Sequence, residues 1–392
     1  MNQRRHITEK HSAPGGGLRI VIAGGGTGGH LFPGIAIAEA FRRRSADNQV
    51  LFITSGRPIE TRVLSQTDYK TFRIAAAGIK GKGILEKLNA LIKVPVGVFA
   101  SIGLFIRFRP NVVIGMGAYS AAPVIFAAWM LGICRVIHEQ NQIPGMTNRF
   151  LARYAHRIYV SFANTDMGGY QDKIRFTGNP VRSEISGQMP DEASKAPSKA
   201  FTVLILGGSQ GAHSINVAVI ESLAYLTESR QFQFIHQTGT ADVDVVRQGY
   251  ADAGIDARVA SFFDDMAACY AAADLIVCRA GATSVAEVAA AGLPAIFIPY
   301  PHAADNHQYF NAKSLVDGGA GEMIAQADLD GRALADRINY YAENDSLRSQ
   351  MKTKIAAFSR PQAADELAED ICRLPGVRNM HKKSGTTALS IT

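Results

Sequence analysis

The sequence contains few cysteines, and they do not form a metal-binding pattern. No Cys-x-x-Cys pair occurs, and no histidine lies at the spacing of a zinc site. Because each cysteine lies in an apolar or helical context, we interpret all of them as reduced residues that pack inside the protein: Cys134, Cys269, Cys278 and Cys372. The sequence therefore predicts no metal site built on cysteine.

The N-terminus lacks the apolar core of a secretory signal. The residues from Met1 to Lys10 are polar and basic, and no apolar run precedes Gly15. We therefore expect the protein to stay in the cytoplasm.

A membrane-spanning helix is also not predicted, although the residues from Pro110 to Cys134 carry no charge and are numerous enough to cross a bilayer. Several glycines and Pro123 interrupt this stretch. It is better interpreted as a buried strand at 112–114, a glycine loop, and an apolar helix from about Ala122.

The sequence lacks the aromatic residues interleaved with arginine that would indicate an RNA-binding surface. The chain is nevertheless basic, with a net charge of +7 and a pI near 9.2. This charge favours an anionic partner, which could be nucleic acid, a phosphorylated substrate or an anionic membrane surface. The missing aromatic pattern argues against nucleic acid.

Length and composition indicate a soluble protein of two domains. A chain of 392 residues exceeds one ordinary hydrophobic core, and its 47% apolar and 19% charged residues are typical of globular proteins. Short apolar segments alternate with helical stretches, as in a doubly wound parallel sheet. The pattern occurs twice, in strands predicted at 18–23, 50–54, 71–74, 112–114, 135–138 and 157–160, then at 201–206, 232–236, 257–259, 275–278 and 295–298.

We therefore predict an α/β protein in which two Rossmann-like, doubly wound parallel-sheet domains face each other across a cleft. The expected divisions are an N-terminal extension at 1–17, a first domain at 18–180, a second domain at 181–358, a C-terminal helix at 359–375 that packs back on the first domain, and a tail at 376–392.

A glycine-rich loop follows the first predicted strand. Its residues from Gly24 to Gly29 match G-x-G-x-x-G between a strand and a helix, where backbone N–H groups can receive a pyrophosphate. A dinucleotide site would also need an acidic residue at the end of the second strand, but that strand ends at Thr54-Ser55-Gly56, so NAD is not expected. His30 follows the loop directly. Its imidazole could remove a proton from an acceptor hydroxyl, or it could simply bind backbone at the helix start.

Two similar loops occur in the second half of the chain. Gly207 to Ala212 follows a predicted strand, and Arg279 to Ser284 follows another and leads into a helix that carries Glu287. A carboxylate at that position suits a ribose diol, although it would also stabilise the helix N-terminus. The polar segment at 305–309 contains side chains that can bind sugar hydroxyls.

Two Asp-x-Asp tripeptides, at 242–244 and 328–330, could suggest a metal-dependent sugar-nucleotide site. Both fall at predicted helix starts, where aspartate is favoured as a cap, so a metal is not expected.

The segment at 79–93 mixes apolar residues with lysines. This composition suits the surface of an anionic membrane, and it also suits an ordinary amphipathic helix with a solvated lysine face. The residues expected to touch a membrane are Ile79, Lys80, Lys82, Ile84, Leu85, Lys87 and Leu88.

Several long motifs, in order and in register over about residues 18–375, resemble the MurG family of bacterial N-acetylglucosaminyltransferases of peptidoglycan synthesis. They are the segments 24–30, 115–119, 138–141, 177–182, 207–212 and 279–308. The resemblance implies an inverting, metal-independent GT-B transferase without a cofactor. Such an enzyme moves N-acetylglucosamine from its UDP conjugate to undecaprenyl-pyrophosphoryl-MurNAc-pentapeptide at the cytoplasmic face of the plasma membrane. The proteins of cell-wall synthesis are then expected partners.

The resemblance also implies residue roles. The second domain would bind the donor, with Phe263 against the uracil, Arg182, Ser209 and the turn from Ala282 to Ser284 on the diphosphate, and Glu287 on the ribose. Asn141, His307 and Gln308 would contact the transferred sugar. His30 is the best candidate for the general base, and the acceptor pyrophosphate would lie on Gly24, Gly25 and Gly26 near Tyr119. The complete predicted donor set is Thr27, Gly28, Gly29, Asn141, Arg182, Ser209, Phe263, Arg279, Ala282, Thr283, Ser284, Glu287, His307 and Gln308.

A UDP-sugar 2-epimerase or another GT-B transferase is the alternative, because these share the architecture and the ribose-binding glutamate. Such an epimerase needs no lysine-ringed apolar face, so the segment at 79–93 distinguishes the two hypotheses.

Overall fold

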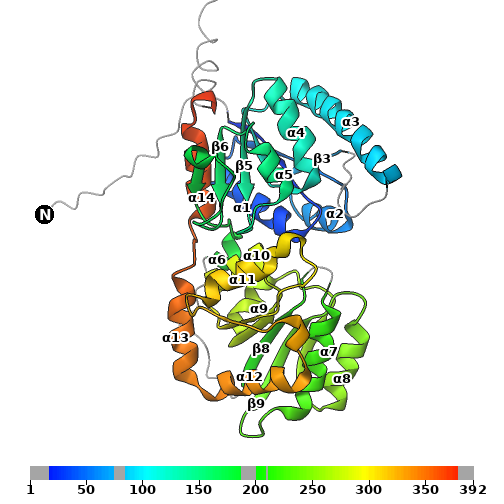
Figure 1. The fold of residues 1–392 in the computed structure, drawn as a ribbon, viewed down its shortest axis with the longest axis vertical. Helices are drawn as coiled ribbons and strands as arrows, with labels where there is room; N and C mark the ends of the chain where they lie inside the picture. Colours follow the sequence, from blue (N-terminus) through cyan, green and yellow to red (C-terminus); the bar gives the residue numbers. More distant parts are fainter. Residues whose placement is uncertain (1–16, 75–83, 187–199, 209–210, 378–392) are drawn as a thin grey trace, which may run out of the picture.

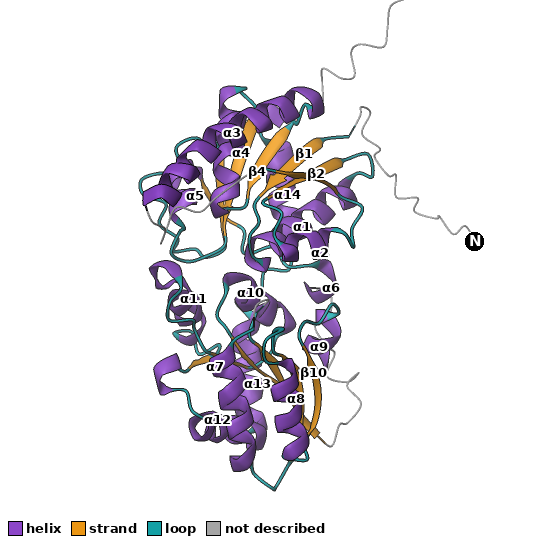
Figure 2. Cartoon of the chain, turned by 90° about the vertical axis from the view of Figure 1, so that its right-hand side faces the viewer, coloured by secondary structure: helices purple, strands orange, loops and turns teal. Residues whose placement is uncertain are grey.

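The structure is a computed structural model that describes residues 17–74, 84–186, 200–208 and 211–377, with side chains described throughout except at 84–93. The chain forms two lobes, one above the other (Figure 1). Each lobe contains a parallel sheet with helices on both faces, and α10 and α11 of the second lobe face the first (Figure 2).

The first lobe has a seven-stranded sheet in the order β3-β2-β1-β4-β5-β6-β7. All of its neighbouring strands are parallel. The strands are β1 Arg19–Ala23, β2 Gln49–Thr54, β3 Lys70–Arg73, β4 Val112–Gly115, β5 Cys134–Glu139, β6 Arg157–Val160 and β7 Ile174–Phe176. The helices are α1 Gly28–Arg44, α2 Pro58–Leu64, α3 Ile84–Phe108, α4 Ala118–Met130 and α5 Met146–Leu151, with the short 3-10 helix η1 at Gln171–Lys173. The next helix, α6 Ser183–Ser186, packs in the core of the second lobe through Ile185.

The second lobe repeats the design with a six-stranded parallel sheet in the order β10-β9-β8-β11-β12-β13. Its strands are β8 Ala200–Leu206, β9 Gln231–Gln237, β10 Asp256–Ala260, β11 Leu275–Cys278, β12 Ala295–Phe297 and β13 Glu322–Met323. Its helices are α7 His213–Ser222, α8 Val243–Asp252, α9 Met266–Ala272, α10 Ala282–Ala291, α11 His307–Val316, α12 Gly331–Glu343 and α13 Asp345–Ala356, with 3-10 turns η3 Leu223–Tyr225, η4 Ala304–Asn306 and η5 Gln326–Asp328. The predicted fold class is confirmed.

Alternating side chains of each central strand serve two separate cores. Ile20 and Ile22 of β1 pack on one face of the first sheet, whereas Val21 and Ala23 pack on the other. Successive side chains of a strand point to opposite faces, so a strand that is apolar at every position must be covered on both sides. The continuous apolar runs in the sequence therefore indicate sheets buried between two layers of helices.

The last helix, α14 (Ala363–Arg373), returns to the first lobe. Its Leu367 and Ile371 are fully buried in the same core cluster as Ile37 and Phe41 of α1. Figure 1 shows α14 beside α1 after the chain has left α13 in the second lobe. The first lobe is thus built from both ends of the chain.

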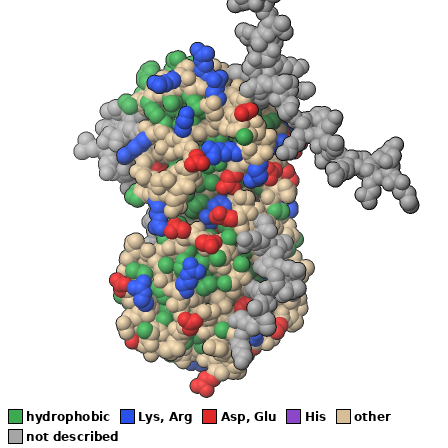
Figure 3. Space-filling model, turned by 180° about the vertical axis from the view of Figure 1, so that it is seen from behind, with side chains coloured by type: hydrophobic (Ala, Val, Ile, Leu, Met, Phe, Trp, Pro, Cys, Tyr) green, Lys and Arg blue, Asp and Glu red, His purple; other side chains and the backbone are tan. Residues whose placement is uncertain are grey.

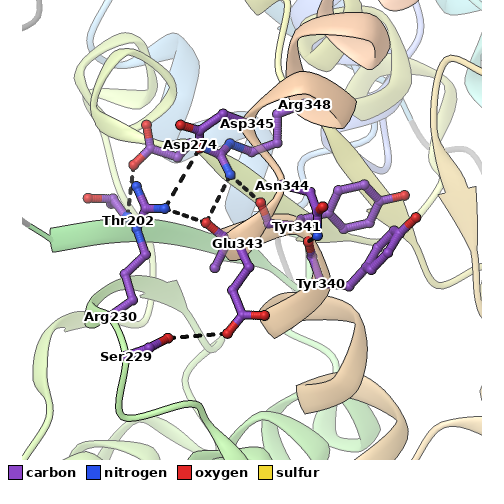
Figure 4. Close-up of polar contacts among 11 residues, drawn as sticks. Thr202, Ser229, Arg230, Asp274, Tyr340, Tyr341, Glu343, Asn344, Asp345 and Arg348 are labelled. Atoms are coloured by element: carbon purple, nitrogen blue, oxygen red, sulfur yellow. Dashed lines mark hydrogen bonds and ion pairs between the residues drawn. The ribbon is translucent and has the colours of Figure 1, made fainter.

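A polar cluster lies where α12 and α13 meet the N-terminal ends of β8 and β9 (Figure 4). The backbone N–H of Thr202 donates to Asp274, 2.9 Å away, and Ser229 donates to Glu343, 3.2 Å away. Arg348 donates to the backbone carbonyl of Tyr341 and pairs with Asp345. The Ser229 contact joins α12 to the segment before β9, and the Arg348 contact joins α13 to α12.

Two expectations from the sequence need correction or extension. Helix α4 begins at Ala118 and not near Ala122, since the backbone enters the helix directly after Gly117. Strands β7 and β13 were not predicted. They have only three and two residues, and neither contains a fully buried residue, so neither gives a recognisable apolar run. Within the described part of the chain, no helix combines the length and apolarity that a membrane span requires.

Candidate active site

The strand order places the glycine loops at the two switch points of the sheets. In the first sheet β1 has β2 on one side and β4 on the other, and in the second sheet β8 lies between β9 and β11. At such a point the loops after the two central strands lead in opposite directions and leave a crevice for a ligand. The loop at 24–27 follows β1, and the loops after β8 and β11 hold the other predicted motifs.

The Glu60 side chain on α2 binds the backbone of the first glycine loop. Its Oε1 accepts from the backbone N–H of Gly26 at 2.6 Å, and its Oε2 accepts from Arg57 N at 2.7 Å. A Cβ on Gly25 would lie 1.7 Å from Glu60 Oε1, so only glycine fits there. The carboxylate already takes the Gly26 N–H, which leaves the N–H groups nearer the start of α1 for an anion. The sequence did not reveal this residue.

His30 lies on the first turn of α1, beside the loop between β4 and α4. Its Nδ1 is 2.9 Å from Gln140 Oε1. Gly117, with φ of +90°, lets the backbone approach the ring, since an added Cβ would lie 3.2 Å from His30 Cε1. Burial lowers the pKa of His30, and the nearby Glu139 carboxylate opposes this shift. The imidazole is therefore neutral at pH 7, as a general base must be.

Glu139 orders the turn that follows β5. Its Oε1 accepts from the Asn141 backbone N–H at 2.9 Å, and its Oε2 accepts from Gly145 N and Asn148 Nδ2 at 3.1 and 2.8 Å. Asn141 in turn accepts a hydrogen bond from Asn311 Nδ2 of the second lobe, 3.2 Å away. The predicted sugar contact Asn141 thus lies where the two lobes meet.

The two lobes touch at their helix N-termini. Thr283, in the first turn of α10, donates through Oγ1 to the Gly29 carbonyl, 3.0 Å away. The side chains of Arg62 and Asp264 also pair across the lobes at 3.0 Å. The N-termini of α1 and α10 therefore lie side by side, and both positive helix ends bear on the same region. The predicted residues Thr27, Gly28, Gly29, Ala282 and Ser284 lie on or next to these turns.

Arg182 and Glu287 pair with each other in a buried position. Arg182 Nη2 is 3.2 Å from Glu287 Oε1, and their side chains are only 11% and 9% exposed. The Tyr270 hydroxyl donates to Glu287 Oε2 at 3.1 Å. The arginine also lies over the Phe32 ring of α1, 4.4 Å from its centroid. The cation predicted for the diphosphate and the carboxylate predicted for the ribose are therefore neighbours.

Other predicted donor residues are engaged with the protein itself. Phe263 is only 4% exposed and packs in the core of the second lobe, with its backbone N–H bonded to Gln237. Arg279 donates to the Ile298 carbonyl at 3.1 Å and to Gln326 Oε1 at 2.7 Å. Arg279 therefore braces the segment after β12, and its side chain does not point freely into the cleft.

The remaining predicted residues border the cleft. His307 bonds through Nδ1 to the Ala304 carbonyl at 2.7 Å, and Gln308 accepts from Tyr300 N at 2.9 Å. Both side chains belong to the first turn of α11, which faces the first lobe. Tyr119 is partly exposed at the start of α4. Ser209 lies outside the described residues, as do Ile79, Lys80 and Lys82. Ile84, Leu85, Lys87 and Leu88 belong to α3, but their side chains lie outside the description.

The tripeptides with paired aspartates have other functions. Asp330 caps α12 by accepting from Ala333 N at 2.7 Å. Asp242 accepts from Asn216 Nδ2 at 2.7 Å. Among the residues that the structure describes, no three His, Cys, Asp or Glu side chains are grouped as metal ligands.

A cavity of about 610 Å³ also lies between the lobes. Its lining is mainly apolar and includes Phe176, Val285, Phe310 and Phe358. Of the predicted site residues only Ala282 contributes to it. The cavity is therefore separate from the region around His30. The candidate active site is the region around His30, where the polar side chains of the two lobes meet.

Known proteins share both lobes. The Glycosyltransferase family 28 N-terminal domain matches residues 20–160, and the Glycosyltransferase family 28 C-terminal domain matches residues 202–367. The crystal structure of Acinetobacter baumannii MurG superposes with a TM-score of 0.72 at 31% identity, over 91% of this chain and 100% of that one. A UDP-GlcNAc 2-epimerase from Neisseria meningitidis, bound to UDP-GlcNAc, superposes with a TM-score of 0.65 at 12% identity, over 91% and 100%. That second similarity concerns the fold alone.

The fold and the paired loops define a glycosyltransferase of the GT-B class. A curated relative from Geobacter sulfurreducens is 44% identical over 90% of this chain and 98% of its own length. That relative is named UDP-N-acetylglucosamine--N-acetylmuramyl-(pentapeptide) pyrophosphoryl-undecaprenol N-acetylglucosamine transferase. The chain belongs to this family of N-acetylglucosamine transferases, within glycosyltransferase family 28.

Proposed function

We propose that this protein transfers N-acetylglucosamine from UDP-GlcNAc to the 4-hydroxyl of MurNAc in undecaprenyl-pyrophosphoryl-MurNAc-pentapeptide, with release of UDP. The observation that carries the proposal is the junction of the two lobes. There a neutral histidine follows a phosphate-type loop, close to the N-terminus of α10. The Thr283 hydroxyl in the first turn of α10 donates to the Gly29 carbonyl, 3.0 Å away. The name of the 44% identical relative supplies the substrates.

In the proposed reaction His30 Nε2 takes the proton from the acceptor hydroxyl as its oxygen attacks C1 of the sugar. The bond between C1 and the UDP oxygen breaks, and inversion at C1 follows from attack on the opposite face. The leaving diphosphate gains negative charge, which the N-terminus of α10 and the cationic Arg182 stabilise. The loop of Gly24, Gly25 and Gly26, with Tyr119 nearby, would lie against the acceptor pyrophosphate, and N–H groups near the start of α1 would bind it, because Glu60 already accepts from the Gly26 N–H.

Most of the proposed donor contacts come from the second lobe. Glu287 would bind the ribose, the turn from Ala282 to Ser284 the diphosphate, and Asn141, His307 and Gln308 the transferred sugar. The support is their placement, because these residues border one region where the first turns of α10 and α11 face the first lobe. Phe263 is buried in the core of the second lobe.

The transfer itself is the first test of the function. We expect labelled N-acetylglucosamine to pass from UDP-GlcNAc to a prenyl-pyrophosphoryl-MurNAc-pentapeptide analogue, with EDTA present and with little product from UDP-glucose or UDP-GalNAc. Binding of UDP-GlcNAc without transfer would contradict the proposal. Conversion of UDP-GlcNAc to its 2-epimer would favour the alternative, a UDP-sugar 2-epimerase.

We also propose that the first lobe binds an anionic membrane surface from the cytoplasmic side, where a lipid-linked acceptor would lie. Large apolar side chains are exposed on α3, α4 and α5: Phe99 by 71%, Trp129 by 44% and Phe150 by 48%. Arginines accompany them, since Arg153 lies over the Phe150 ring at 4.9 Å. Figure 3 shows hydrophobic side chains beside Lys and Arg side chains at the upper end of this lobe. Apolar anchors among cations suit anionic lipid.

Replacing Trp129 and Phe150 together with serine is expected to weaken binding to vesicles that contain anionic phospholipid by about thirtyfold, because loss of each ring removes about 1 kcal/mol of apolar burial. Sedimentation with sucrose-loaded vesicles measures the change. Val245→Ser is the matched control, since Val245 is 73% exposed on α8 of the second lobe. Equal loss in both variants, or none in the first, would exclude this surface.

A further inference from the structure

A chain of hydrogen bonds leads from the Gly178 carbonyl through His138 and Gln140 to His30. His138 Nε2 lies 3.3 Å from the Gly178 carbonyl, and its Nδ1 lies 3.0 Å from Gln140 Nε2. Gln140 Oε1 then lies 2.9 Å from His30 Nδ1. His138 and Gln140 are fully buried, so water does not offer these groups alternative partners. The identity of each donor can therefore be worked out from the protein alone.

The carbonyl oxygens at the two sides of Gln140 fix the direction of the chain. The Gln140 amide nitrogen also lies 3.0 Å from the Met116 carbonyl and 3.3 Å from the His138 carbonyl. Carbonyl oxygens can only accept, so this end of the amide must be the NH2 group and the other end must be the oxygen. Gln140 Oε1 can only accept as well, and His30 must donate to it from Nδ1.

His138 reinforces the same direction. Its Nε2 faces a carbonyl and must carry the proton, which leaves the Nδ1 lone pair to accept from Gln140. Burial lowers the pKa of His138 to about 4, so the ring stays neutral and keeps this lone pair at pH 7. A protonated His138 would present two N–H groups at close range, and the Gln140 amide would then face a donor with its own NH2.

We propose that His138 and Gln140 are positioning residues that hold His30 in the tautomer with its proton on Nδ1 and its lone pair on Nε2. A neutral imidazole has one proton, and only the unprotonated nitrogen can act as a base. Free histidine exchanges between tautomers, so an enzyme gains by selecting one before the acceptor arrives. The proposal rests on the proposed function only in taking Nε2 as the atom that faces the acceptor hydroxyl.

The charged and titratable groups around His30 leave this assignment unchanged. Glu139 on β5 raises the pKa of His30, while His307 at the start of α11 lowers it, and His138 faces it from the same strand as Glu139. A hydrogen bond with the Met116 backbone also raises the pKa of His30. The contact that fixes the proton on Nδ1 is the hydrogen bond to Gln140 Oε1.

The direct test is nitrogen NMR of the full-length protein labelled with 15N-histidine, with His30→Gln used to assign the signal. We expect neutral His30 with the proton on Nδ1 at pH 7.5. A proton on Nε2 would overturn the proposal. This measurement needs no substrate, so it remains decisive even if the chain fails to transfer N-acetylglucosamine.

Gln140→Met supplies the second test, because methionine keeps the length of the side chain but cannot accept from His30. We expect the population with the proton on Nε2 to rise and kcat to fall about tenfold, with the KM for UDP-GlcNAc nearly unchanged. The acid limb of the pH profile should also move to lower pH, since the hydrogen bond that His30 donates to Gln140 raises the pKa of His30. A loss of kcat without a change in tautomer or acid limb would mean a purely structural role. Gln171→Met, at an exposed position in η1, is the matched control.

Discussion

His30→Ala is expected to lower kcat by about 10²- to 10⁴-fold, the range that general-base catalysis contributes. Binding of UDP-GlcNAc should remain nearly intact, because the ring lies on α1 of the first lobe and bonds to Gln140 of the same lobe. Single-turnover transfer and calorimetric titration of UDP-GlcNAc would separate the two effects. Loss of donor affinity in place of turnover would contradict the placement of His30 on the acceptor side.

The matched control for this variant is His156→Ala. His156 accepts from Arg135 N at 3.2 Å. Arg135 lies at the N-terminal end of β5, and the cleft lies at the opposite end of this strand. It therefore shares the residue type and the lobe but not the site. Normal turnover in this control would show that the loss in His30→Ala reflects the position and not the removal of an imidazole from the lobe.

The pH dependence of the wild-type enzyme follows from the same residue. Burial lowers the pKa of His30 below its ordinary value of 6.5. The neutral, active form is then present above that lowered pKa and is lost as the pH falls through it. We expect the acid limb of kcat/KM to have its midpoint below pH 6.5. A fall that begins above pH 7 would mean that His30 is more basic than its surroundings imply.

Glu287→Ala is expected to destabilise the second lobe and to abolish tight donor binding. The change leaves the buried Arg182 guanidinium without its partner at 3.2 Å and the Tyr270 hydroxyl without its acceptor at 3.1 Å. Breaking a buried ion pair from one side costs about 3–5 kcal/mol, because the remaining charge stays desolvated. Glu184 also contacts Arg182, at 3.2 Å, but its side chain is 55% exposed and compensates only in part.

Urea unfolding and titration with UDP-GlcNAc would measure the two effects of Glu287→Ala. The control is Glu366→Ala, an exposed glutamate in the first turn of α14. An unchanged unfolding midpoint would refute the energetic role of the pair. Stability loss with full donor affinity would instead refute the ribose assignment and leave the pair as a purely structural feature.

Much of the fold was predictable because parallel strands buried on both faces are apolar at every position. The runs at β1, β4, β8 and β11 stand out for that reason, and the glycines after them indicate where the backbone turns into a helix. The strands β7 and β13 were missed, because three and two residues without a fully buried side chain are too few to form a recognisable apolar run. The start of α4 was placed four residues too late, since the helix begins at Ala118 and was expected from about Ala122.

The candidate site was predictable where a residue adjoins a loop of special backbone geometry. His30 follows the glycine loop, and the turn from Ala282 to Ser284 begins a helix after a strand. Glu60 was missed because it acts from another helix, on a loop 34 residues earlier in the chain. Arg279 was expected at the donor, but whether an arginine faces a ligand or a carbonyl depends on neighbours from distant segments.

The sequence by itself determined two parallel α/β sheets, the positions of their phosphate-type loops and the family to which the chain belongs. These properties are local, since burial pattern and backbone geometry are encoded within a few consecutive residues. Only the tertiary structure decided which side chains meet. His30 and Gln140 are 110 residues apart, Arg182 and Glu287 are 105 apart, and Thr283 and Gly29 are 254 apart. Such pairs depend on the packing of whole elements, because hydrogen bonds and ion pairs require atoms within about 3 Å of each other, and no local pattern specifies that distance.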